Sequence, residues 1–165
     1  MATLETLLAN GLILPWRVHL SPRQQVERLL YLLPEFQPRL DQKLAGAGST
    51  WNIEETPAQQ LDTLTAIFVA GEPLAFGWQF KSLAHHRGGV WYLKTADIRL
   101  FGWFPRRDLF IAASIAIAEE IKHLRLYRGF GDEVVQLRNA LPLDEPKFIG
   151  GHDPNAVVSN FTYPA

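Results

Sequence analysis

The chain has 165 residues, of which 47% are hydrophobic and 20% charged, with 16 basic and 17 acidic side chains. This composition is typical of one compact domain, residues 1–165, that can fold without metal or disulfide support. The absence of cysteine excludes a disulfide scaffold, a thiolate zinc site and a cysteine nucleophile, and the net charge of −1 argues against a nucleic-acid binder held mainly by phosphate contacts.

No segment of the sequence is predicted to span a membrane. The longest apolar run covers residues 109–118 and is interrupted by Ser114, whereas a membrane span needs about 20 residues. Residues 1–10 lack the basic start of a secretory signal, and their leucines are spaced as on one face of a helix. We therefore expect a soluble, cytoplasmic protein.

The N-terminal third is predicted to be helical. Residues 21–24 (Ser-Pro-Arg-Gln) have the composition of a capping box. Apolar side chains then recur at helical spacing over residues 26–33, until Pro34 ends the pattern. A second, short helix is predicted over residues 37–44, before a glycine-containing break at residues 46–49.

Three strands are predicted next, as an antiparallel meander. The first two cover residues 66–69 and 74–80, and Gly71-Glu72 between them is typical of a hairpin connection. Residues 85–89 (His-His-Arg-Gly-Gly) are predicted to form the next turn. The third strand, residues 90–98, is rich in β-branched and aromatic side chains.

The remaining chain is predicted to contain two helices and one or two final strands. Asp108 is expected to cap a long central helix over residues 109–126 that is apolar on most sides. Residues 129–131 (Gly-Phe-Gly) are expected to close that helix, and Asp132 to begin a shorter one that ends before Pro142. The final strands are predicted over residues 147–149 and 156–163. The order of the elements indicates an α+β fold.

This order, with N-terminal helices, a β-meander and a long helix packed on the sheet, resembles the GNAT acyltransferase superfamily. Four short stretches also resemble the toxin-activating lysine acyltransferases, bacterial cytoplasmic enzymes that acylate RTX toxins. They are Ser21-Pro22 before a segment ended by Leu33-Pro34, residues 72–78 (Glu-Pro-Leu-Ala-Phe-Gly-Trp), Asp97 followed by Phe101-Gly102, and residues 148–151 (Phe-Ile-Gly-Gly). The resemblance implies transfer of a fatty acyl group from acyl carrier protein, or from acyl-CoA, to a lysine of a protein substrate.

The resemblance also implies that Asp97 is a catalytic carboxylate. Lysine acylation needs a base, commonly a histidine oriented by a carboxylate. In that family the catalytic histidine follows the Ser-Pro pair, where this chain has Arg23 and Gln24. His19, which precedes the pair, is therefore the proposed substitute. The missing histidine is also compatible with a family member that has lost activity. If Asp97 lies on an apolar side of the predicted strand, its carboxylate is buried and must have a hydrogen-bonding or charged partner. The alternative is a strand-end carboxylate bonded to backbone amides or to Arg99.

No bound cofactor is expected, and the candidate donor-binding residues are basic and aromatic. The turn over residues 102–108 has a single glycine and is a poor phosphate cradle, so Arg106 and Arg107 would suit an acidic carrier protein better than CoA. Trp78 and Trp91 could line an acyl pocket. The alternatives are a solvated turn for the two arginines and core positions for the two tryptophans.

Metal sites are only weakly indicated. Glu120 and His123 have a Glu-x-x-His spacing, but it occurs once, and His85-His86 and His152-Asp153 lie in predicted turns with no third ligand indicated. We therefore expect no metal site. The alternative to an enzyme is a non-enzymatic interaction module, such as an immunity, adaptor or chaperone protein, that binds a protein partner through its sheet face. A homodimer is also compatible with the sequence.

Overall fold

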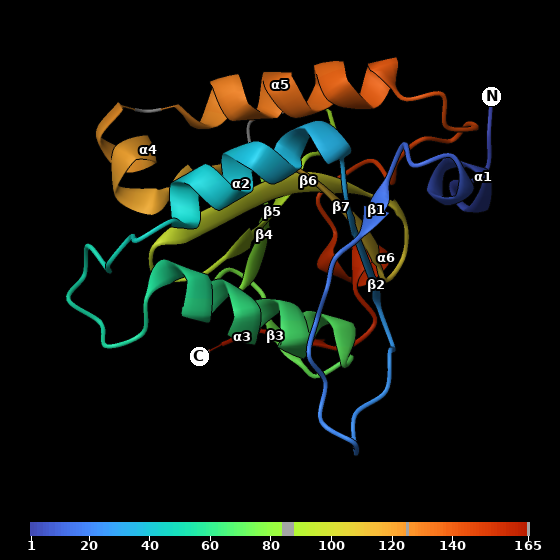
Figure 1. Ribbon diagram of the computed structural model, residues 1–165. Helices are drawn as coiled ribbons and strands as arrows, with labels where there is room; N and C mark the ends of the chain where they lie inside the picture. The colour runs from blue at the N-terminus through green and yellow to red at the C-terminus, as the bar shows by residue number, and fades with distance from the viewer. Residues whose placement is uncertain (84–87, 125, 165) are drawn as a thin grey trace.

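A computed structural model describes residues 1–83, 88–124 and 126–164, with the backbone alone for residues 122–124. It confirms the α+β class. A mostly antiparallel sheet forms the centre of the molecule, and helices cover both of its faces (Figure 1). No helix in these ranges is long and apolar enough to cross a membrane.

The chain begins with mixed helices and short strands. In order, they are α1 (Leu4–Ala9), β1 (Leu14–Pro15), β2 (Leu29–Leu32), the 3-10 helix η1 (Pro34–Phe36), α2 (Gln37–Leu44) and α3 (Pro57–Val69). The second part supplies most of the sheet. Its elements are β3 (Leu74–Ala75), β4 (Phe80–Ser82), β5 (Trp91–Lys94), β6 (Ile98–Arg106), β7 (Leu109–Ile117), α4 (Ala118–Leu124), α5 (Tyr127–Ala140), α6 (Pro154–Val157) and β8 (Phe161–Thr162).

Six strands of the described chain form the main sheet, in the order β1-β2-β7-β6-β5-β4. Strands β4 to β7 pair antiparallel with their neighbours in chain order and form a meander. β2 joins the sheet parallel to β7, with Leu29 opposite Leu109. β3 and β8 form a separate parallel pair. Each of these two parallel pairings joins segments that lie about half the chain apart.

The helices form a layer on each face of the sheet. α2 and α5 lie side by side on one face, where an ion pair joins Arg39 to Glu133, and α3 lies on the other (Figure 1). Phe101 of β6 stacks on Phe130 of α5, with ring centroids 5.1 Å apart. Phe104, further along β6, packs against Phe68 of α3. Both faces of the central strands are therefore buried.

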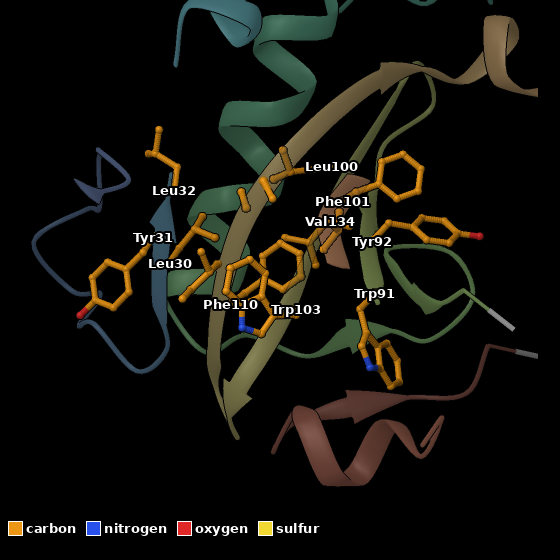
Figure 2. Packing of buried hydrophobic residues seen from close by; sticks show 14 of the residues in the cluster. Leu30, Tyr31, Leu32, Trp91, Tyr92, Leu100, Phe101, Trp103, Phe110 and Val134 are labelled. Atoms are coloured by element: carbon orange, nitrogen blue, oxygen red, sulfur yellow. The ribbon is translucent and has the colours of Figure 1, made fainter. Parts of the chain in front are cut away.

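Aromatic side chains make up much of the core between these layers (Figure 2). Trp103 and Phe110 lie on the neighbouring strands β6 and β7 and are fully buried. Gly102 of β6 stands where the two strands approach so closely that a β-carbon would overlap the carbonyl oxygen of Ile111. The aromatic surplus of the sequence thus lies mainly in the core.

The predicted helix over residues 26–33 is wrong, because Leu29–Leu32 is strand β2. Half of the capping box expected at residues 21–24 forms, since Ser21 N donates to Gln24 Oε1, whereas Gln24 N donates to the backbone carbonyl of Ser21 and not to its hydroxyl. They close a turn that no helix follows. The run Leu-Leu-Tyr-Leu suits either element, and pairing with β7 selects the strand. The helix predicted over residues 37–44 is confirmed as α2.

The predicted meander exists, but with different strands. Residues 66–69 are the end of α3, which begins with a complete capping box between Thr56 and Gln59. The strand predicted over residues 74–80 is two short strands, β3 and β4, separated by a tight turn at Gly77. The strand predicted over residues 90–98 ends at Lys94. Residues 85–87 of the predicted turn lie outside the described part of the chain.

The long helix predicted over residues 109–126 is also wrong, because its first half is strand β7. This strand is buried on both faces and is apolar at nearly every position, so its sequence has no period of two. Asp108 caps no helix. It lies in the tight β6–β7 turn with a φ of 63°.

The predictions for the last quarter of the chain are partly wrong. Residues 129–131 and Asp132 lie inside α5 and do not separate two helices. No strand forms at residues 147–149. The strand predicted over residues 156–163 is reduced to β8 and follows the short helix α6.

Candidate functional site

Asp97 lies in the turn between β5 and β6 and is completely buried. Its Oδ1 accepts hydrogen bonds from the backbone nitrogen and the hydroxyl of Thr50, at 2.9 and 2.8 Å. Its Oδ2 accepts one from Nε2 of Gln60 at 2.5 Å. The Gln60 amide also accepts from the Asp97 backbone nitrogen at 3.1 Å and donates to the carbonyl of Glu55. Asp97 therefore ties the α2–α3 loop and the first turn of α3 to the sheet.

These hydrogen bonds favour the ionised form of Asp97. Burial alone would raise the pKa of the carboxyl group, but the hydrogen bonds from Gln60, Ser49 and Thr50 outweigh it and hold the pKa below its ordinary value. A carboxylate with a lowered pKa and with donors from three residues already in place is a weak proton acceptor. Its arrangement is that of a structural anchor.

The structure does not bring His19 to Asp97. His19 is exposed on the loop that leads from β1 into β2. The first residue of β2, Leu29, pairs with the first residue of β7, Leu109, so this loop lies near the end of the sheet where β7 begins. Asp97 precedes Ile98, which pairs with Ile117 at the opposite end of β7. Neither His19 nor the exposed His152 donates to Asp97. The side chains of His85, His86 and His123, the last of which is the histidine of the Glu-x-x-His spacing, lie outside the described part of the structure.

Arg106 and Arg107 are also remote from Asp97. Both are exposed at the β6–β7 turn, and Arg107 donates to Asn155 at 3.0 Å. Nine residues of extended strand separate Arg106 from Asp97, which corresponds to about 30 Å. A donor held by these arginines would therefore dock at the opposite end of β6.

The two tryptophans predicted to bind a donor have different environments. Trp91 is a core residue, stacked on Phe80 with ring centroids 5.9 Å apart, and a ligand could reach it only by opening the core. Trp78 is 67% exposed in the turn between β3 and β4. It lines a hollow in the described surface.

This hollow, which we name the Trp78 cleft, has a volume of about 730 Å³. It lies between α3 and the turns that join β3 to β4 and β5 to β6. Its apolar wall contains Ile53, Leu64, Ile67 and Trp78, and its basic wall contains Lys94 and Arg99. Ligand sites in proteins commonly have volumes of 300–1,000 Å³, so the cleft is large enough to take a ligand.

Lys94 and Arg99 lie directly opposite each other on β5 and β6. Lys94 Nζ donates to the carbonyl of Gly77 at 2.9 Å. One terminal nitrogen of Arg99 donates to the carbonyls of Thr95 and Ile98. The Arg99 Nε is buried without a hydrogen-bond partner. The basic wall is thus fixed by carbonyl groups.

A second hollow of about 480 Å³ lies on the other side of Asp97. Asp97 and Thr50 line it together with Lys43 and Glu120, whose charged atoms are 3.5 Å apart. Gln60 lines the Trp78 cleft and Asp97 this second hollow, so their hydrogen-bonded pair separates the two. Within the described ranges, no group of three acidic or histidine side chains could hold a metal ion.

Sequence reasoning identified Asp97 as a carboxylate that needs a partner but missed Thr50 and Gln60. The missed signal is the capping box at residues 56–59, which would have placed the start of α3 and with it Gln60. The pairing of Lys94 with Arg99 depends on strand register, for which the sequence has no local marker.

Comparison of the chain with models of known protein families, with curated proteins and with solved structures finds no match.

Proposed function

We propose that the protein is a non-enzymatic interaction module that holds a segment of a partner protein in the Trp78 cleft. The observation that carries this proposal is the exposure of two large apolar side chains at the cleft, 67% for Trp78 and 42% for Ile53. Tryptophan is among the residues that contribute most to protein interfaces.

The turn that presents Trp78 is ordered by hydrogen bonds. Trp78 N donates to the carbonyl of Ala75 at 3.1 Å, and Gly77 N to that of Phe80 at 2.8 Å. The Gln79 side chain accepts from Ala75 N at 2.8 Å. A turn whose backbone is already ordered loses little further backbone entropy when a partner covers Trp78. The exposed indole is therefore prepared for contact.

The cleft is a better candidate than the sheet face for binding a partner. Strands β6 and β7 are buried on both sides, by α5 and α2 on one face and by α3 on the other. A partner that used the sheet face would have to displace a helix. This burial supports the cleft beside the sheet, at the turns, as the proposed interaction surface.

Covering Trp78 has a substantial energetic value. An exposure of 67% corresponds to roughly 150 Å² of a tryptophan side chain, which is worth about 4 kcal/mol at about 25 cal/mol per Å². Ordering of the partner offsets part of this gain. We therefore expect Trp78→Ala to weaken binding at least tenfold.

A displayed library of random peptides tests the proposal directly. Selection on the wild-type protein, with counter-selection on Trp78→Ala, should enrich peptides whose affinity falls at least tenfold on the variant. Trp51→Ala is the matched control, because Trp51 is 53% exposed but does not line the cleft. The proposal is wrong if no enriched peptide discriminates the wild type from Trp78→Ala, or if Trp51→Ala has the same effect.

Lysine acylation on a GNAT-like, toxin-activating acyltransferase framework is the second candidate. It is favoured by the apolar wall of the cleft, which is large enough for an acyl chain, and by Gln60, which connects the cleft to Asp97. It is weakened because the lowered pKa of Asp97 makes this carboxylate a poor base, and because His19 lies near the opposite end of β7 from Asp97. Incubation with acylated carrier protein, acyl-CoA and a lysine peptide, followed by mass spectrometry, decides between the two: an acylated peptide favours the transferase.

A further inference from the structure

We propose that the partner segment held at the Trp78 cleft is a proline-rich stretch in the polyproline II conformation, which packs on the exposed rings of Trp78 and Tyr163. This inference rests on the proposed function and specifies its partner. Two features carry it: a pair of exposed aromatic rings on one small structural unit, and hydrogen-bond donors beside these rings that have no protein partner in the described part of the chain.

The two rings belong to the unit formed by β3, β8 and the turn that follows β3. Trp78 is 67% exposed and Tyr163 is 68% exposed. β8 pairs with β3, and Phe76 N donates to the carbonyl of Thr162 at 2.8 Å. The Tyr163 ring contacts the Phe76 ring, with centroids 5.7 Å apart, and Trp78 follows Phe76 by two residues. One short peptide can therefore cover both rings.

Ring contacts restrain Tyr163 although most of its side chain faces solvent. Its ring meets that of Phe76 at an interplanar angle of 73° and that of Phe161 at 77°, both T-shaped contacts. Aromatic pairs in this geometry attract each other. Tyr163 therefore has less side-chain freedom to lose when a partner covers it.

The groups beside the two rings offer more donors than acceptors. The Ala75 carbonyl already accepts from the backbone nitrogens of Trp78 and Gln79, at 3.1 and 2.8 Å. The Gln79 Oε1 accepts from Ala75 N at 2.8 Å. By contrast, Trp78 Nε1, Gln79 Nε2 and the Tyr163 hydroxyl can all donate and have no hydrogen-bond partner among the described residues. A ligand that supplies acceptors would satisfy them.

A proline-rich segment has the complementary chemistry. Each proline has a backbone carbonyl but no N–H, and a polyproline II helix makes no internal hydrogen bonds, so the segment presents acceptors and few donors. Its proline rings pack on aromatic side chains, and its conformation exists before binding. An α-helix would bring carbonyls that are already hydrogen-bonded. A β-strand would bring N–H donors that find few free acceptors at this turn.

NMR of the indole N–H groups tests the proposal directly. The probe is a peptide of about ten prolines, and a glycine–serine peptide of the same length is the control. The Trp78 indole signal is assigned by its loss in Trp78→Phe, and that of Trp51 by its loss in Trp51→Phe. We expect millimolar oligoproline to move the Trp78 indole proton downfield, as a new hydrogen bond to a carbonyl does, and to leave the Trp51 signal in place. An unmoved Trp78 signal would overturn the inference.

Variants that keep the rings test the donors separately. Trp78→Phe and Tyr163→Phe each remove one donor and should weaken oligoproline binding about three- to tenfold, the effect of one neutral hydrogen bond. Tyr163→Ala also removes a ring and should weaken binding further. Trp51→Phe is the matched control and should bind as the wild type does, because Trp51 does not line the cleft.

The peptides from the library selection separate this inference from the proposed function. If their affinity depends on Trp78 but is unchanged when their prolines are replaced by alanine, or is unchanged by Tyr163→Ala, this inference is wrong while the proposed function stands. If neither oligoproline nor any library peptide discriminates the wild type from Trp78→Ala, both are wrong.

Discussion

The hydrogen bonds around Asp97 predict that Asp97→Asn destabilises the fold strongly although the two side chains have nearly the same shape. Asparagine can keep one oxygen for the two donors of Thr50. Its amide nitrogen then faces Nε2 of Gln60, donor against donor. Turning the Gln60 amide would repair this contact but would direct its NH₂ group at the backbone nitrogen of residue 97, which now donates to Gln60. No arrangement satisfies every group.

The magnitude follows from the interactions that are lost. A hydrogen bond to a charged group contributes about 1.5–3 kcal/mol, and a buried donor left without a partner costs about 1–3 kcal/mol. The lowered pKa of Asp97 indicates that the folded state favours the charged form despite burial. We therefore expect the free energy of unfolding to fall by about 3 kcal/mol, a large share of the roughly 5–15 kcal/mol typical of a whole domain.

Urea denaturation followed by circular dichroism measures this loss. With a slope of about 2 kcal/mol per molar urea, the unfolding midpoint of Asp97→Asn should lie about 1.5 M below that of the wild type. Asp62→Asn is the control, because Asp62 is an exposed carboxylate on the same helix, α3. A midpoint within about 0.5 M of the wild type, at an unchanged slope, would refute the structural role of Asp97 and reopen the catalytic one.

The stabilising effect of Asp97, measured as the difference between wild type and Asp97→Asn, should depend on pH. Because the folded-state pKa of Asp97 lies below its value in the unfolded chain, the stabilisation is complete above the unfolded value of about 3.9 and is lost as the pH falls through the folded value. The difference in unfolding free energy between wild type and Asp97→Asn should therefore narrow below about pH 4. A difference that stays constant down to pH 2 would contradict the assignment.

Two further predictions concern the sheet. Gly102→Ala should lower the unfolding free energy by about 3 kcal/mol, because the new methyl group would overlap backbone of β7, whereas Gly129→Ala, on open α5 surface, should be neutral or slightly stabilising in the same urea assay. Burial raises the pKa of Tyr92 to about 12, and Tyr127 adds to this rise, so wild-type stability should fall between about pH 10 and 12. Tyr92→Phe should flatten that decline, and an unchanged decline would show that Tyr92 does not cause it.

The elements that could be predicted are those with a local physical cause. Helix α2 has the bounds that the sequence predicts, and the glycine-containing break after Leu44 delimits its end. Strand β7 could not be predicted, because burial on both faces removes the alternation that marks a half-exposed strand. In the candidate site, too, one residue could be predicted from its local sequence and its partners could not. Asp97 stands out as a carboxylate in a predicted strand, but its partners come from a loop 47 residues earlier and a helix 37 residues earlier.

The sequence by itself determined the α+β class, the exclusion of cysteine chemistry and the need of Asp97 for a partner if buried. Each of these depends on composition or on residues close together in the chain. Only the tertiary structure decided that His19 and Arg106 lie far from Asp97, and that Lys94 faces Arg99 beside an exposed Trp78. These relations depend on strand register and on the parallel pairing of β2 with β7, which joins segments about 80 residues apart. Such pairing is set by the burial of both faces of the sheet together, and no local pattern encodes it.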